Sequence, residues 1–209
     1  MLDTERLYKG AWQRAASQLG YGLDDDFYFT LVGCTNAAGE RALAEHFGPD
    51  FPLVAFRERW AGLWRQEVQV AGIPLKPGLL ELLDYLADRE IPVAVATSSE
   101  RGYVDFSLQM AGADVRRFAH VVTGEQVARG KPAPDIYLEA AERLGVDPAG
   151  CMAAEDSDAG VLSASAAGMR AVMVPDLKPP SPAARAAAFR VLTSLHEMVS
   201  LLKLSAERH

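Results

Sequence analysis

The sequence predicts an α/β fold in which a doubly wound parallel sheet is joined to an all-helical domain. Three observations predict it: a helical periodicity through the first third of the chain, a break at the Pro/Gly-rich segment 73–78, and short apolar runs that alternate with helices afterwards. Runs rich in valine and alanine, without polar alternation, are typical of strands buried on both faces, and strands that alternate with helices form parallel sheets.

The N-terminal segment, from Glu5 to about Gly72, is predicted to be helical throughout. Apolar residues recur at helical spacing on two faces, one with Leu7, Ala11, Ala15 and Leu19, the other with Phe56, Trp60, Leu63 and Trp64. Asn36 is predicted to cap a helix that Gly48 ends, and Pro52 to lie in the first turn of the helix that carries two tryptophans. The tryptophans are expected in a hydrophobic core.

The segment after residue 73 is predicted to form the sheet and the helices that cover it. The pattern predicts helices at 78–90, 100–112, 134–145 and 157–168, and strands at 92–97, 120–124, 151–156 and 170–175. The Pro/Ala-rich segment 178–188 is predicted to be a connecting loop, followed by a closing amphipathic helix. Ligands of doubly wound sheets bind at the carboxyl ends of the strands, so the residues that follow each strand are the candidates for a site.

Composition narrows the class of protein. With 209 residues, 49% of them hydrophobic, the chain can bury a core of its own. Its net charge of −7 disfavours a nucleic-acid or anionic-membrane surface, which would repel it. Cys34 and Cys151 are far apart and lack metal-ligand spacing, which predicts neither a disulfide framework nor a zinc site. No apolar run reaches the roughly 18 residues that span a bilayer. We therefore expect a cytoplasmic monomer that acts on a small molecule, with no nucleic-acid or membrane partner.

Two polar segments precede predicted helices. Thr97, Ser98 and Ser99 stand where the first predicted strand gives way to a helix. A helix cap is the simpler interpretation; alternatively, the Thr97 hydroxyl and the N–H groups after it hold phosphate oxygens at the positive end of the helix. Lys131 stands in the turn Gly130-Lys131-Pro132. Lysines in turns are usually solvated, but the flanking Gly and Pro fix the backbone and can aim the ammonium group at an anion.

A third polar segment ends the predicted strand 151–156. Glu155 and Asp156 there are followed by Ser157. The segment is either a helix cap or a pair of hard oxygen ligands for Mg²⁺, which takes one or two carboxylates together with phosphate oxygens and water. Each segment by itself favours the simpler interpretation.

Together and in this order, the segments resemble a known family. Thr97 after a strand, Lys131 in Gly-Lys-Pro-x-Pro-Asp, Glu-Asp-Ser-x-x-Gly at 155–160 and the Ala-x-Ala-Ala-Gly-Met that follows resemble the haloacid dehalogenase superfamily, specifically its β-phosphoglucomutase-like phosphatase branch. The resemblance covers essentially the whole chain. It implies a Rossmann-like core with a helical cap domain, in which residues 1–4 are a remnant of the nucleophile loop, 5–73 the cap and 74–209 the core.

The resemblance also implies roles for individual residues. Thr97, Ser98 and Lys131 would bind phosphate, with Thr97 and Lys131 serving the catalytic step, and Glu155 and Asp156 would hold Mg²⁺. The implied function is a Mg²⁺-dependent phosphatase of small phosphorylated metabolites, sugar phosphates above all, that works through an aspartyl-phosphate.

The chain departs from the family at its start. The family reaction begins with an aspartate that attacks phosphorus, and a second aspartate two residues later is the general acid/base. In the family, both aspartates precede the segment that Leu-Asp-Thr-Glu at 2–5 resembles. Asp3 matches the aspartate of that later segment and is therefore neither of the two catalytic aspartates. The central first strand that carries them, flanked by 92–97 and 151–156, is then absent, which leaves N–H and C=O groups unpaired at about 1–3 kcal/mol each. We therefore expect an N-terminally truncated, inactive chain in which Met1 is an internal methionine.

Two alternative functions stay open. One is a non-catalytic pseudoenzyme that binds a phosphorylated ligand, and the other is a sugar phosphomutase. A mutase of this branch resembles this chain but has a histidine where Tyr8 stands and an arginine near Asn36. Tyrosine, with a pKa near 10, is a poor proton shuttle at neutral pH, and neutral Asn36 cannot clamp a second phosphate as a guanidinium does. Both departures favour the phosphatase.

Overall fold

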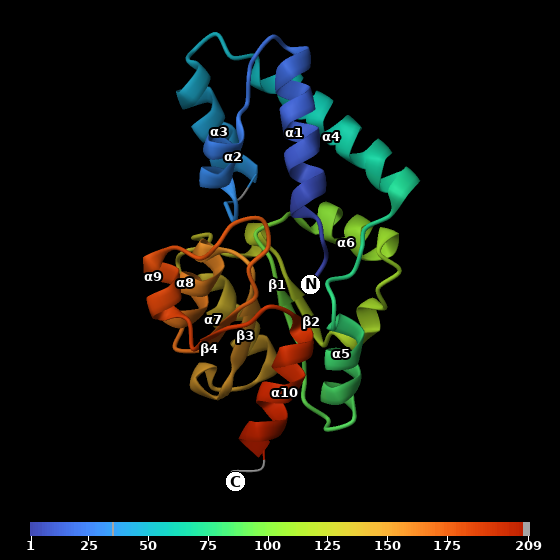
Figure 1. Ribbon diagram of the computed structural model, residues 1–209, viewed down its shortest axis with the longest axis vertical. Coiled ribbons are helices and arrows are strands. Elements are labelled where there is room, and N and C mark those ends of the chain that lie inside the picture. The colour runs from blue at the N-terminus through green and yellow to red at the C-terminus, as the bar shows by residue number, and fades with distance from the viewer. Residues whose placement is uncertain (35, 207–209) are drawn as a thin grey trace.

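The computed structural model describes residues 1–34 and 36–206, as a helical unit that lies against an α/β unit (Figure 1). The helical unit, called the cap below, contains α1 (Glu5–Gln18), α2 (Asp25–Leu31), α3 (Asn36–Phe47) and α4 (Leu53–Ala71). Trp60 and Trp64 of α4 are fully buried in the cap core, as expected. Among the described residues, no helix is long and apolar enough to cross a bilayer.

Two expected helix starts in the cap are off by one position. Asn36 is the first residue of α3 rather than its cap, and the position before it lies outside the described residues. Pro52 stands just before the first turn of α4 rather than in it. Its fixed φ, here −79°, is compatible with either position.

The α/β unit, called the core below, alternates helices and strands as predicted. Its helices are α5 (Leu79–Ala87), α6 (Arg101–Met110), α7 (Asp135–Leu144), α8 (Asp158–Ala166), α9 (Pro182–Ala187) and α10 (Leu195–Ala206). Its strands are β1 (Ala94–Ala96), β2 (His120–Val122), β3 (Met152–Glu155), β4 (Arg170–Met173) and β5 (Arg190–Val191), with single 3-10 turns at Val115–Arg117, Gly124–Gln126 and Pro148–Gly150.

The loop predicted at 178–188 was wrong, because α9 lies within it. The Ser181 side chain caps α9 by accepting a hydrogen bond from the Ala184 N–H at 3.2 Å. Pro182 occupies the first turn, where a missing N–H costs no hydrogen bond. Ala184 is fully buried. Burial of the alanine face therefore makes a helix of a segment whose two prolines suggest a loop.

The strands form two separate parallel sheets rather than one continuous sheet. β1 pairs with β2 in one sheet, and the order β3-β4-β5 makes up the other. In the part of the chain that the structure describes, no strand pairs with both β1 and β3. A cavity of about 1020 Å³ is bordered by both strands, and its walls include the apolar side chains of Leu79, Val95 and Met198. The predicted sheet is thus split at the place where the central first strand was expected to be absent.

The chain crosses between cap and core in two segments that lie side by side. Residues 1–3 run antiparallel to 74–76: the Asp3 N–H donates to the Pro74 carbonyl and the Lys76 N–H to the Met1 carbonyl, both at 2.9 Å. The Lys76 ammonium contacts the carboxylates of Asp3 at 2.9 Å and of Asp176 at 2.6 Å. The two crossings are thereby fastened to each other and to the core.

The end of α2 rests directly on the core. The Lys178 ammonium donates to the Phe29 carbonyl at 3.0 Å, and the Ser98 hydroxyl to the Gly33 carbonyl at 3.4 Å. Gly33 has φ +87°, and a Cβ there would lie 3.0 Å from the Ser157 side chain. Only glycine permits this approach of cap to core without strain.

Candidate active site

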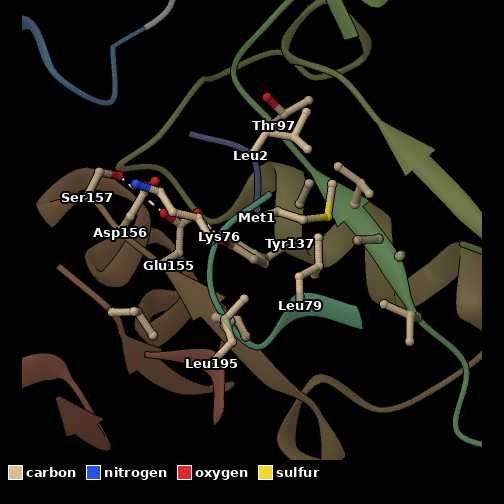
Figure 2. A pocket seen from close by; sticks show the side chains of 18 of the residues that line it. Met1, Leu2, Lys76, Leu79, Thr97, Tyr137, Glu155, Asp156, Ser157 and Leu195 are labelled. Atoms are coloured by element: carbon tan, nitrogen blue, oxygen red, sulfur yellow. Dashed lines mark hydrogen bonds between the residues drawn. The ribbon is translucent and has the colours of Figure 1, made fainter. Parts of the chain in front are cut away.

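The carboxyl ends of β1 and β3 face one cavity. Thr97 follows β1, Glu155 ends β3, Asp156 follows it, and Lys131 lies in the turn before α7; all four line the cavity. Figure 2 shows Glu155 and Asp156 at one side of this space and Thr97 at another, with Met1 and Leu2 between them. The structure thus brings together the residues that the sequence singled out.

The hydroxyl segment after β1 does not cap the next helix. Glu100 is the residue before α6, and its side chain makes no capping hydrogen bond. Instead, the Ser99 N–H donates to the Thr97 hydroxyl at 3.2 Å, and the Thr97 N–H extends the β1-β2 pairing by donating to the Val122 carbonyl at 3.0 Å. The simpler interpretation is therefore wrong for this segment, and the anion-binding interpretation stays a prediction.

Lys131 is buried rather than solvated. Its side chain is 6% exposed, and its ammonium group donates to a carboxylate oxygen of Glu155 and to the Ala96 carbonyl at 3.1 Å. It therefore ties the end of β1 to the end of β3 across the gap between the two sheets.

Both Glu155 oxygens are engaged. Oε1 accepts from Lys131 and from the Tyr137 hydroxyl, and Oε2 accepts from the Ser157 hydroxyl at 3.2 Å. Burial by itself would raise the pKa of Glu155, but the Lys131 charge and the hydrogen bonds from Lys131, Tyr137 and Ser157 hold it below its ordinary value. Glu155 is thus an ionised, buried carboxylate whose Oε1 accepts two hydrogen bonds and whose Oε2 accepts one.

Ser157 caps α8, as the simpler interpretation of this segment predicted. Its hydroxyl accepts a hydrogen bond from the Gly160 N–H at 3.1 Å. The pairing of Tyr137 with Glu155 was missed, since nothing in the sequence relates a helix residue to a strand end 18 positions away.

Replacing Gly160 with alanine is expected to destabilise the chain, because a Cβ there would overlap the Glu155 carboxylate. The displaced carboxylate would lose its donors, so we expect a loss of about 1–3 kcal/mol. Gly62→Ala is the matched control: Gly62 is exposed in α4 with no atom near its added Cβ, and alanine there should stabilise by about 0.5–1 kcal/mol. Urea unfolding measures both, and equal effects of the two substitutions would contradict the packing of Glu155 on α8.

Asp156 differs from its neighbour. No side chain in residues 1–34 and 36–206 donates a hydrogen bond to it, and burial together with the Glu155 charge raises its pKa. A buried carboxylate beside a second carboxylate is an environment that a cation stabilises, so Asp156 fits a magnesium ligand. No group of three or more His, Cys, Asp or Glu side chains in the described residues gathers as a metal site. The role of Glu155 and Asp156 as magnesium ligands stays a prediction.

Tyr8, where a mutase would carry histidine, is packed as a core residue. Its ring stacks on Trp64 with centroids 5.1 Å apart, and burial raises its pKa further above the neutral range. The side chain of Asn36 lies outside the described residues.

Comparison with known proteins gives the family. Residues 2–168 match the haloacid dehalogenase-like hydrolases. The chain belongs to this family. It is 33% identical over 187 residues to the protein CbbY of Rhodobacter capsulatus, an overlap of 84% of this chain and 81% of that one. It is 32% identical over 174 residues to the phosphorylated carbohydrates phosphatase of Thermotoga maritima, covering 82% and 79% of the two chains.

A solved structure gives the branch within this hydrolase family. The crystal structure of a putative β-phosphoglucomutase from Thermotoga maritima is similar to this chain with a TM-score of 0.76 and 29% identity, covering 97% of this chain and 94% of that one. Together with the two relatives, it places this haloacid dehalogenase-like hydrolase in the β-phosphoglucomutase-like branch, with an α/β core, parallel strands and an N-terminal helical cap.

Proposed function

We propose that the chain is the greater part of a Mg²⁺-dependent phosphatase that hydrolyses small phosphorylated metabolites, above all sugar phosphates, through an aspartyl-phosphate. The observation that carries the proposal is the convergence of Thr97, Lys131, Glu155 and Asp156 on one cavity at the carboxyl ends of β1 and β3. The similarity to a phosphatase of phosphorylated carbohydrates supports the substrate class.

The nucleophile is proposed to lie on a strand that precedes Met1 in the complete protein. Such a strand would fill the cavity between β1 and β3, pair with both, and end beside Lys131. Three features support this placement: the split between the two sheets, the apolar walls of the cavity, and the position of Met1 and Leu2 inside it (Figure 2). Residues 1–4 would then be the remnant of the nucleophile loop.

Each site residue receives a role from its contacts. The Thr97 hydroxyl and the Ser98 N–H would donate hydrogen bonds to phosphoryl oxygens, and Lys131 would neutralise the phosphoryl group and the attacking carboxylate. Glu155 orients Lys131 through the buried ion pair. When bound by Asp156 and Glu155, Mg²⁺ would offset the charge of the transferring group.

A phosphatase is favoured over a mutase by Tyr8. A mutase must return the phosphoryl group to a sugar hydroxyl, which requires a proton shuttle that titrates near neutral pH. The stacked, partly buried Tyr8 cannot supply one, because its pKa is raised above its ordinary value. In a chain with its nucleophile restored, β-glucose 1-phosphate should release phosphate faster than it forms glucose 6-phosphate; the opposite order would make the protein a mutase.

As the chain stands, we expect no phosphatase turnover, because Thr97, Lys131, Glu155 and Asp156 can hold a phosphate ester but cannot attack it. The assay is hydrolysis of p-nitrophenyl phosphate with Mg²⁺. Turnover that survives purification and disappears in the Asp156→Ala variant would show that the nucleophile lies within residues 1–209 and would overturn the placement proposed above.

A further inference from the structure

A carboxylate and a phenol from two cap helices face the cavity without a role in the chemistry described above. Glu5 stands in the first turn of α1 and Tyr28 in α2, and the Tyr28 hydroxyl donates to Glu5 Oε1 at 2.6 Å. Both side chains line the cavity that also contains Thr97 and Asp156.

The Glu5–Tyr28 pair is held in place by packing, and Glu5 can still accept further hydrogen bonds. Tyr28 is buried, and its ring packs edge-on against Trp12 with centroids 6.2 Å apart. Among the described residues, Tyr28 alone donates a hydrogen bond to Glu5, so Oε2 keeps its acceptor capacity. Burial raises the pKa of Glu5 to about 7, with a smaller contribution from the charge of Asp156, so that the carboxylate is mostly ionised at pH 8. Glu5 lines the same cavity as Thr97 and Asp156 of the proposed phosphate site.

We propose that Glu5, positioned by Tyr28, binds a hydroxyl of the substrate's leaving group and excludes substrates that carry a second phosphate at that end. This inference rests on the proposed function and adds a substrate preference to it: sugar or polyol monophosphates over the corresponding bisphosphates.

The chemistry of the pair gives both halves of the preference. The Tyr28 proton is already donated to Oε1, so the pair presents only acceptors to a ligand. A sugar hydroxyl can donate to them, and a hydrogen bond to a charged, partly buried acceptor is stronger than one between neutral groups. A second phosphate has no proton to donate at pH 8, and its charge would be repelled by Glu5 in a site of low dielectric constant.

The test is isothermal titration calorimetry of the chain at pH 8 with inorganic phosphate, fructose 6-phosphate and fructose 1,6-bisphosphate. Fructose 6-phosphate is expected to bind about tenfold more tightly than phosphate, and the bisphosphate no more tightly than phosphate. Glu5→Gln should weaken the binding of fructose 6-phosphate by about tenfold and strengthen the binding of the bisphosphate, because glutamine removes the charge and keeps the shape. Tyr28→Phe should weaken fructose 6-phosphate and leave the bisphosphate excluded.

Opposite shifts of two ligands distinguish recognition from loss of structure, which would weaken all ligands alike. Glu58→Gln, on an exposed residue of α4, is the matched control and should change none of the three affinities. A Glu5→Gln variant that changes all three affinities equally or not at all, or a wild-type chain that binds both sugar phosphates equally, overturns the inference while phosphate binding still supports the phosphatase. If neither phosphate nor fructose 6-phosphate binds to the chain, both the proposed function and this inference are contradicted.

Discussion

Extending the chain at its N-terminus with an apolar strand that ends in Asp-x-Asp-Gly is expected to give the chain phosphatase turnover. The strand would enter the gap between β1 and β3 and bring its first aspartate to the cavity that Thr97 and Lys131 line. It would also stabilise the fold, because each new ladder hydrogen bond contributes about 0.5–1.5 kcal/mol and apolar side chains would fill the cavity. Phosphate release from sugar phosphates and urea unfolding measure the two effects.

The control is the same extension with asparagine in place of the first aspartate. It should stabilise the chain as much as the aspartate version does, because it makes the same strand, and yet release no phosphate. Equal turnover by the two versions would show that the added aspartate is not the nucleophile. A strand that leaves stability unchanged would show that it does not occupy the gap.

Replacing Lys131 with methionine is expected to lower the free energy of unfolding by about 3–5 kcal/mol at pH 7, because it leaves the buried Glu155 carboxylate without its cation. The pH dependence should reverse as well. In the parent chain the lowered pKa of Glu155 gives stability that is present above the unfolded-state pKa and lost as pH falls through the folded-state value. In the variant, burial without the cation raises that pKa, so stability is present at low pH and is lost as pH rises.

Urea unfolding at pH 5 and pH 7 distinguishes loss of the Lys131–Glu155 ion pair from a loss of packing. The Lys131→Met chain should regain stability relative to the parent at pH 5, and the double variant Lys131→Met with Glu155→Gln should recover much of the loss at pH 7, because no unpaired charge remains buried. If both variants lose the same free energy at both pH values, the loss comes from packing rather than from the ion pair.

Much of the fold could be predicted because the apolar spacing that marks a helix or a strand lies within a short stretch of sequence. The apolar spacing of Phe56, Trp60 and Trp64 predicts a buried helix face, and all three are buried. The valine- and alanine-rich runs after residue 90 predict strands, and β1, β3 and β4 are found within them. Segment 178–188 was mistaken for a loop because proline suggests a break, whereas Pro182 stands at the one helix position that tolerates it.

The site was predictable as a set of residues but not as a set of contacts. Motif order gives Lys131 and Glu155, whereas their ion pair depends on two strand ends that only the tertiary fold brings together. Glu5 ends the family-like Leu-Asp-Thr-Glu at 2–5 and Tyr28 belongs to no motif, so nothing in the sequence pairs the two residues. Side-chain contacts between segments distant in sequence depend on tertiary packing, which sequence periodicity does not predict.

The antiparallel pairing of residues 1–3 with 74–76 limits how the cap can move. Both crossings are hydrogen-bonded to each other along one short line, and Lys76 joins that line to Asp176 of the core. These bonds hold one edge of the cap against the core. Translation away from the core would break these bonds. Rotation about the line would break the contacts of Lys178 with Phe29 and of Ser98 with Gly33, and also the stacking of Trp60 in the cap on Tyr103 of α6. Movement of the cap is therefore opposed at three places: the paired crossings, the end of α2, and the aromatic contacts between α4 and α6.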